Sequence, residues 1–67
     1  MDAFQFSDAI EDLLDDLPEE AILYDEVRRT RSFERADVLT SNAGIVVRMK
    51  GGTEFQLTIV QSEREQG

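Results

Sequence analysis

The sequence predicts an α+β fold, with one or two N-terminal helices packed on a C-terminal antiparallel β-hairpin or small three-stranded sheet. Apolar residues recur at steps of three and four in the first 17 positions, which is helical spacing. Residues 45–60 instead alternate apolar and polar on either side of a Gly-Gly pair, which is strand spacing around a turn. With 67 residues the chain forms one small domain, which we assign to residues 1–60, followed by a polar tail at 61–67.

The first predicted element is an amphipathic helix over about residues 7–17. Ser7 is suited to the N-cap, and acidic residues in the first turns suit the positive end of the helix dipole. The apolar side of this helix consists of Phe6, Ile10, Leu13, Leu14 and Leu17. The opposite side consists of Asp8, Glu11, Asp12, Asp15 and Asp16, with no Lys or Arg among them. Like charges four residues apart weaken a helix, so this sequence gives up local stability to keep one face uniformly negative.

The middle of the chain is harder to assign. Pro18 fits the first position of a helix over 19–30, and the two glutamates after it suit a first turn. Because Ala21 and Ile22 fall off the apolar side of such a helix, a strand over 21–31 is the rival assignment. A capped turn at 32–36, a short strand at 37–40 and a turn at 41–44 follow.

The register of the hairpin follows from the alternation of side chains, because the apolar residues of both strands must lie on the same face of the sheet. A two-residue loop at 51–52 would place Val47 opposite Gln56 and mix the two faces of the sheet. A three-residue loop at 50–52 places Val47 opposite Phe55, keeps one face apolar, and puts Gly52 at a left-handed position. A loop at 51–53 preserves the parity but requires Thr53 to adopt that conformation. We therefore predict the loop at 50–52, which also sets Ile45 opposite Leu57 and pairs Arg48 with Glu54 across the strands.

The charge is unevenly distributed along the chain. Residues 1–27 contain ten acids and no Lys or Arg, whereas residues 28–67 contain five acids and seven bases, so −10 and +2 give the net charge of −8. A basic cluster of Arg28, Arg29, Arg31 and Arg35 follows the acidic part. We assign these arginines to neutralisation of nearby acids or of a second copy's acidic helix, and the alternative is contact with a phosphate backbone. Tyr24 and Phe33 are assigned to packing, and stacking on bases is the alternative.

The composition argues against several classes of function. Without His or Cys, the usual general base, thiol nucleophile, zinc ligands and disulfides are all missing. We therefore expect no enzymatic activity, no cofactor and no metal site. The N-terminus lacks the basic residues of a signal peptide, and the longest strictly apolar run is four residues at 21–24, so we expect a cytoplasmic protein. The acidic part should repel nucleic acid and anionic membranes, which leaves basic protein surfaces as partners.

The first functional hypothesis is a small binding protein that docks its acidic helix on a basic surface. The predicted partner-binding residues are Asp8, Glu11, Asp12, Asp15, Asp16 and Glu19. In its sharpest form the helix mimics DNA, because carboxylates at about 1.5 Å rise per residue approximate the charge spacing of about 1.7 Å along a duplex. The size and the acidic, Cys-free composition resemble those of phage-encoded inhibitors of host defence and repair proteins. The alternative is that these acids only solvate the helix.

The second hypothesis is an assembly module. A hairpin leaves a free strand edge, to which a strand of another copy or of a partner can add. Homodimerisation would enlarge a core that is necessarily thin in so short a chain. In this case the acidic face is merely solubilising.

Overall fold

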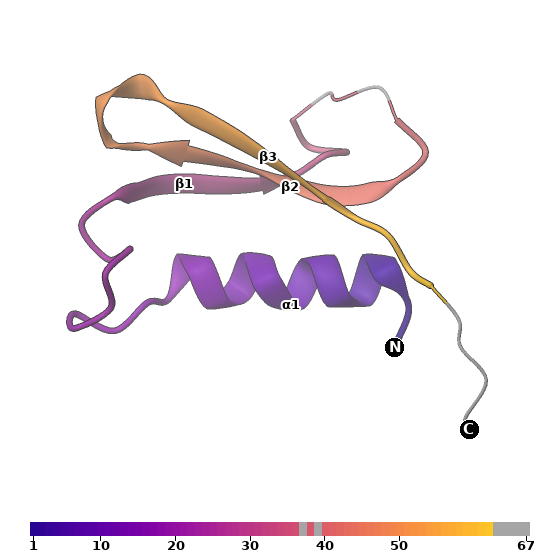
Figure 1. Ribbon diagram of the computed structural model, residues 1–67, viewed down its shortest axis with the longest axis horizontal. Coiled ribbons are helices and arrows are strands. Elements are labelled where there is room, and N and C mark those ends of the chain that lie inside the picture. Colours follow the sequence, from indigo (N-terminus) through magenta and orange to yellow (C-terminus); the bar gives the residue numbers. More distant parts are fainter. Residues whose placement is uncertain (37, 39, 63–67) are drawn as a thin grey trace.

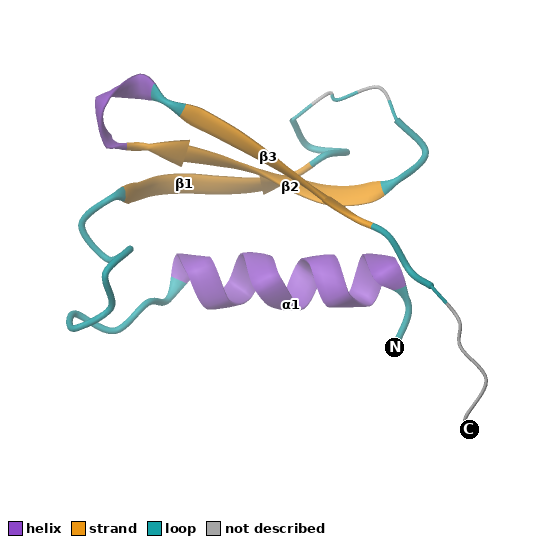
Figure 2. Ribbon diagram, viewed as in Figure 1, coloured by secondary structure: helices purple, strands orange, loops and turns teal. Residues whose placement is uncertain are grey.

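The chain folds into two layers, one helix against one three-stranded antiparallel sheet (Figure 1). The computed structural model of the protein describes residues 1–36, 38 and 40–62. The elements are α1 at Ala3–Asp15, β1 at Val27–Ser32, β2 at Ala43–Met49 and β3 at Glu54–Ile59. The strand order is β1-β2-β3, so β2 is central and both β1 and β3 are edges (Figure 2). The predicted α+β class is confirmed.

The helix begins four residues earlier than the sequence suggested. Asp2, and not Ser7, is the N-cap: its carboxylate accepts a hydrogen bond from the Gln5 backbone N–H at 2.8 Å. The Gln5 side-chain oxygen in turn accepts from the Asp2 N–H at 2.9 Å, which completes a capping box. Ser7 lies inside the helix and is buried. The helix ends at Asp15, before the predicted 17.

The second helix predicted at 19–30 is wrong. Residues 19–26 form consecutive turns, with hydrogen bonds such as Tyr24 N–H to the Ala21 carbonyl at 3.0 Å. Residues 27–32 form β1, so the rival strand assignment is correct for its second half. β-Branched Val27 and Thr30 fit this strand. Residues 33–36 form the predicted turn, whereas 43 and 44, predicted as turn, belong to β2. The strand predicted at 37–40 includes residues 37 and 39, which lie outside the described residues, and Val38 and Thr40 are not in a strand.

The hairpin has the predicted register. Val47 lies opposite Phe55, Ile45 opposite Leu57 and Arg48 opposite Glu54. The Met49 N–H donates to the Thr53 carbonyl at 2.7 Å, which closes the three-residue loop at 50–52. Both glycines in this loop have positive φ, +88° at Gly51 and +96° at Gly52.

The apolar core is small and centres on β2. Its buried members are Phe33, Ala43, Ile45, Val46 and Val47. Outside it, ten large apolar side chains are exposed in the described part of the chain, so more of them lie outside the core than inside. The fold therefore leaves much apolar surface uncovered.

Candidate functional site

The six acids predicted to bind a partner do not share one outward face. Glu11 is buried at 6% exposure, and its carboxylate forms an ion pair with Arg35. Asp15 accepts a hydrogen bond from the Thr30 hydroxyl of β1. Glu11 and Asp15 therefore attach α1 to the β1 side of the molecule. Placing Glu11 on the solvated side of the helix was wrong.

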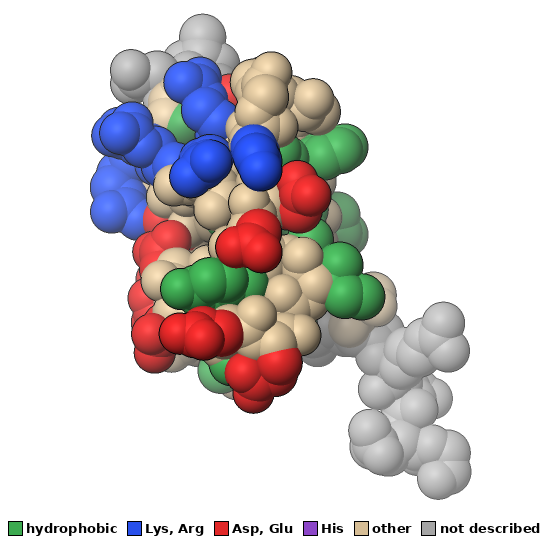
Figure 3. Space-filling model, turned by 90° about the vertical axis from the view of Figure 1, so that its left-hand side faces the viewer, with side chains coloured by type: hydrophobic (Ala, Val, Ile, Leu, Met, Phe, Trp, Pro, Cys, Tyr) green, Lys and Arg blue, Asp and Glu red, His purple; other side chains and the backbone are tan. Residues whose placement is uncertain are grey.

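The other four predicted partner-binding acids lie on the surface. Asp8, Asp12, Asp16 and Glu19 are all exposed, and no ion pair involves them in the part of the chain that the structure describes. In the view of Figure 3, acidic side chains gather over the lower part of the molecule and basic side chains over the upper part. In the sequence, α1 contains acids and no bases, whereas β1 and β2 contain arginines and no acids.

The helix is rotated about its own axis, so that its apolar side does not face the sheet directly. At 100° per residue, the buried Ser7 and Glu11 point about 90° away from the middle of the predicted apolar side. Ile10, Leu14 and Leu17 are consequently only half-buried. Phe6 and Leu13 remain 46% and 64% exposed and face the side opposite to the Asp15–Thr30 contact. Since that contact is to β1, the apolar side of α1 turns toward β3.

β3 adds further exposed apolar side chains on the side of the sheet that faces the helix. Phe55 and Leu57 lie on the same sheet face as Val47 and Ile45, which the helix covers, but they are 53% and 39% exposed. This is because α1 packs mainly against β1 and β2. We call the surface formed by Phe6, Leu13, Phe55 and Leu57 the open apolar face.

A pocket of about 350 Å³ lies at one end of the open apolar face. The N-terminal residues of the chain and Phe6 form one wall, and Ile59 and Val60 form the other. The Gln61 side chain accepts a hydrogen bond from the Ala3 backbone N–H at 3.0 Å, which ties the chain after β3 to the start of the helix. The sequence pattern predicts an apolar side of the helix and an apolar face of the hairpin, but it does not predict this surface, because the surface depends on how the helix is rotated over the sheet.

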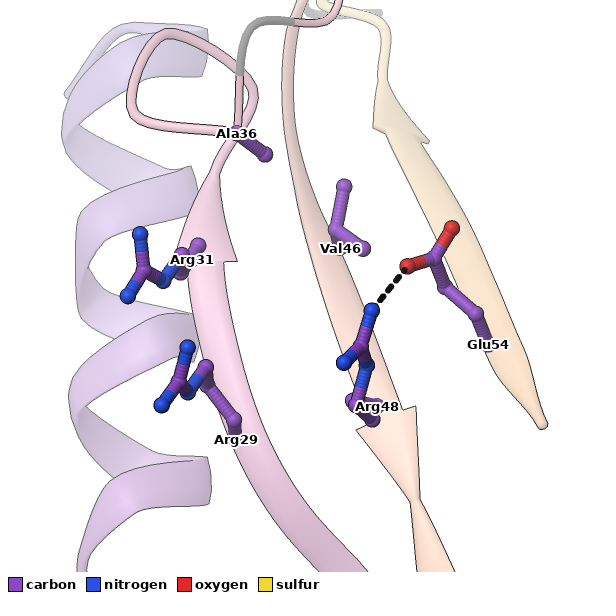
Figure 4. A pocket seen from close by; sticks show the side chains of 6 residues that line it. All are labelled: Arg29, Arg31, Ala36, Val46, Arg48 and Glu54. Atoms are coloured by element: carbon purple, nitrogen blue, oxygen red, sulfur yellow. Dashed lines mark ion pairs between the residues drawn. The ribbon is translucent and has the colours of Figure 1, made fainter. Parts of the chain in front are cut away.

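A second pocket, of about 200 Å³, lies on the other face of the sheet. It is lined by Arg29, Arg31, Ala36, Val46, Arg48 and Glu54 (Figure 4). Thr30 faces the helix, and because side chains alternate along a strand, Arg29 and Arg31 face away from it. The predicted arginine cluster is therefore divided: Arg35 neutralises Glu11, whereas Arg29 and Arg31 line this pocket.

Phe33 is buried in the core, as predicted, whereas Tyr24 is 45% exposed. Among the described residues, no group of three or more acidic side chains is arranged to hold a metal ion. Within the same residues, no helix has the length and apolar character needed to cross a membrane.

Comparison with known proteins adds no relative to this description. No protein-family model matches the sequence, and no curated protein or solved structure is significantly similar to it.

Proposed function

We propose that the protein is a small, non-enzymatic protein-binding module that assembles with a second copy of itself through the edge of β3 and the open apolar face. The observation that carries this proposal is that β3 is an edge strand without the features that normally protect such edges. The proposal places the assembly in the cytoplasm, in keeping with a chain that has no Cys.

The two edges of the sheet differ sharply. The β1 edge carries Arg28, Arg29 and Arg31, and its register with β2 shifts between Val27 and Arg29, which is a bulge or similar irregularity. Charged side chains and bulges are the devices by which proteins prevent edge-to-edge pairing. β3 has the sequence EFQLTI, with no Lys, Arg or Pro, and its register with β2 is continuous. Within the part of the chain that the structure describes, the β1 edge is therefore blocked and the β3 edge is open.

The backbone of β3 can accept another strand. Because Met49 and Thr53 form a hydrogen-bonded pair, alternation along the ladder directs the backbone groups of Phe55 and Leu57 toward β2. The N–H and C=O groups of Glu54, Gln56 and Thr58 then point to the open side. Three residues thus present unpaired donors and acceptors along a strand about 20 Å long.

A second copy can pair with this edge without a clash between the two helices. Antiparallel pairing of two β3 strands about a two-fold axis gives one six-stranded sheet with both helices on the same face. Strands about 4.8 Å apart place the two helices about 19 Å from each other, if each lies over β1 and β2. Helices with a radius of about 5–6 Å leave a strip about 8 Å wide between them. Two rows of side chains fill this width, and each β3 supplies one row with Phe55 and Leu57.

The charge distribution also permits self-association. Asp8, Asp12 and Asp15 lie on the β1 side of the helix or away from the sheet, as the contact of Asp15 with Thr30 shows. Pairing through β3 therefore keeps the acidic faces of two copies apart, although each copy has a net charge of −8. The central residues of β3 are uncharged, so the strands meet without like-charge contacts.

The apolar area on offer is substantial for so small a chain. Phe6 and Phe55 are each about half exposed, which for phenylalanine corresponds to roughly 75–125 Å² apiece. Leu13, Leu57 and Val60 add to this area. Stable interfaces bury about 800 Å² per partner. The strand backbone and these side chains together offer an area of this order.

A proline at the centre of the edge tests the proposal. Gln56→Pro removes a backbone N–H that points outward, while proline on an edge strand leaves the pairing with β2 intact. We expect wild-type protein to sediment at twice the monomer mass at about 100 μM, a concentration that populates weak dimers, and Gln56→Pro to sediment as a monomer.

Gln56→Ala is the matched control, because it removes the same side chain but keeps the N–H. It should remain dimeric, and circular dichroism should show the same strand content in all three proteins. A wild-type protein that is monomeric at this concentration, or a proline variant that still dimerises with native strand content, would refute the proposal.

The acidic helix remains a second candidate, favoured by the four exposed acids without ion pairs described above. In this form the protein binds a basic surface of another protein, such as a nucleic-acid-binding enzyme, and imitates the charge of a nucleic acid. Reversal of two of these charges, Asp12→Lys with Asp16→Lys, is expected to abolish partner capture from lysate at low salt without changing the β3 dimer. Capture that survives both the reversal and about 500 mM salt argues against a role for the acidic helix.

A further inference from the structure

The pocket on the sheet face opposite to the helix is lined by three arginines, and the protection of a sheet edge against unwanted strand pairing does not account for all of them. Arg29 and Arg31 extend next to one another from β1, and Arg48 extends from β2 toward Glu54 of β3 (Figure 4). Arginines on an edge strand prevent unwanted pairing. Arg48 cannot serve this purpose, because β2 is the central strand.

Two of the arginines are neighbours across the sheet. Arg29 and Arg48 are direct partners in the register between β1 and β2. Like charges directly opposite on neighbouring strands destabilise a sheet. The Arg29 and Arg31 side chains extend side by side, away from β2 (Figure 4), and an anion bound by these two guanidinium groups would offset the repulsion.

The acids among the described residues do not fill this role. Of the described residues that line the pocket, one is acidic, Glu54, and its carboxylate lies 3.6 Å from an Arg48 guanidinium nitrogen. Within the described part of the chain, Arg29 and Arg31 form no ion pair. The acids of α1 lie on the other side of the sheet, as the contact of Asp15 with Thr30 shows. Among the described residues that line the pocket, three arginines and one glutamate give a charge of +2.

The geometry points to a binding site for a phosphate group, held by Arg29 and Arg31 with Arg48 completing the positive field. A phosphate monoester carries about −1.5 to −2 at neutral pH, which matches the local +2 more closely than a single carboxylate does. Guanidinium groups present forked N–H donors that suit phosphate oxygens. Val46, buried at 8% exposure, and half-buried Ala36 supply the apolar part of the pocket lining.

The size and charge of the molecule favour a small ligand over a polymer. The pocket volume of about 200 Å³ is below the roughly 300–1,000 Å³ of pockets that enclose drug-sized molecules. It has room for one phosphate group and little more. The net charge of −8 repels a long polyanion such as DNA, whereas a single phosphate meets mainly the local field.

Titration with inorganic phosphate tests this site. Isotope-labelled protein is titrated by NMR with sodium phosphate at about pH 7.5, where inorganic phosphate is mainly the dianion, and separately with sodium acetate and sodium chloride at the same ionic strength. Phosphate should produce saturable shifts of the backbone amides of Arg29, Arg31, Val46 and Arg48. Acetate and chloride should not. Glycerol phosphate is titrated in parallel. A lower dissociation constant than that of inorganic phosphate identifies a phosphate monoester as the preferred ligand, and a higher one identifies the free ion.

Three arginine variants supply the decisive comparison. Arg29→Gln and Arg31→Gln each remove a charge that lines the pocket, and each should raise the phosphate dissociation constant about tenfold or more, the effect of one lost charge-assisted hydrogen bond. Arg28→Gln makes the same change on the same strand but outside the pocket, and should leave the constant unchanged. Equal weakening by all three variants, or shifts reproduced by chloride at matched ionic strength, would show a general charge effect and overturn the site.

Discussion

Replacement of Gly44 by alanine is expected to destabilise the protein strongly. Gly44 lies in β2, where a Cβ atom would overlap the ring of Phe33 and the backbone carbonyl oxygen of Leu57. The ring is buried in the core, and the carbonyl belongs to β3, next to β2 in the sheet. Neither can move away without a loss of packing or of strand pairing. Overpacking of this kind costs about 1–3 kcal/mol or more, a large share of the roughly 3–10 kcal/mol expected for a domain of this length.

Gly51→Ala is the matched control, because it adds the same methyl group. Gly51 has a φ of +88°, but nothing lies within 4 Å of the added Cβ. Its cost is therefore only the strain of a left-handed residue, about 1–2 kcal/mol. Thermal unfolding followed by circular dichroism should show a much lower midpoint for Gly44→Ala than for Gly51→Ala. Equal midpoints would mean that the atoms around Gly44 move to accommodate the methyl group, and that the close packing at Gly44 is not needed for folding.

The hairpin could be predicted from the sequence because its information is local. Alternation on each strand defines two faces, and the Gly-Gly pair limits the loops that keep these faces matched. Gly52 was expected at a left-handed position and is found there, together with Gly51. A register set by parity and turn geometry needs no knowledge of the rest of the molecule.

The roll of the helix could not be predicted, because it depends on partners far along the chain. Periodicity placed Glu11 among the solvated acids, and a hydrophobic surface alone would have turned Ile10 and Leu13 inward. Arg35, 24 residues later, pairs with Glu11, and Thr30 donates a hydrogen bond to Asp15. These polar contacts orient α1 over β1 and β2. The spacing of apolar residues along the helix does not show which polar residues far along the chain will pair with it.

The same roll explains why the candidate site differs from the one that the sequence suggested. The sequence pointed to the acidic side of the helix as the binding face and to the apolar side as the packing face. In the structure, polar contacts take up Glu11 and Asp15, and part of the apolar side remains uncovered beside β3. The second hypothesis, strand addition at the hairpin edge, comes nearer to this surface, and β3 with its sequence EFQLTI has no protective charge at its centre.

The segment after the first helix was misassigned for a related reason. Pro18 followed by two glutamates is a good helix start by local rules. The chain instead makes turns at 19–26, and the Lys50 N–H donates to the Glu26 carbonyl at 2.7 Å, which anchors the end of these turns beside the hairpin loop. Pairing with β2 then extends residues 27–32 as β1. Tertiary pairing overrides local preference here, as is common in short segments.

An acidic residue at the centre of the open apolar face is expected to abolish self-association. Phe55 is half exposed in the single chain, so Phe55→Asp should leave the sheet folded with a moderate loss of stability. In the proposed dimer, Phe55 lies in the strip between the two helices, and the two-fold axis brings its copy close by. Each dimer would then bury two carboxylates without partners, which is strongly unfavourable. We expect the dimer dissociation constant to rise at least about 100-fold, or about 2.7 kcal/mol.

Ile22→Asp is the control for this variant, because it introduces the same charge at a residue that is 91% exposed and lies in the turns after α1, away from β3. It should dimerise like the wild type when both are measured by sedimentation equilibrium. The wild-type and Ile22→Asp unfolding midpoints should also rise with protein concentration, since dimerisation stabilises the folded chain by mass action, whereas that of Phe55→Asp should not. If Ile22→Asp weakens association as much as Phe55→Asp does, added negative charge alone accounts for the effect. The interface would then have to be sought elsewhere than on β3, because burial of the open apolar face predicts a difference between the two.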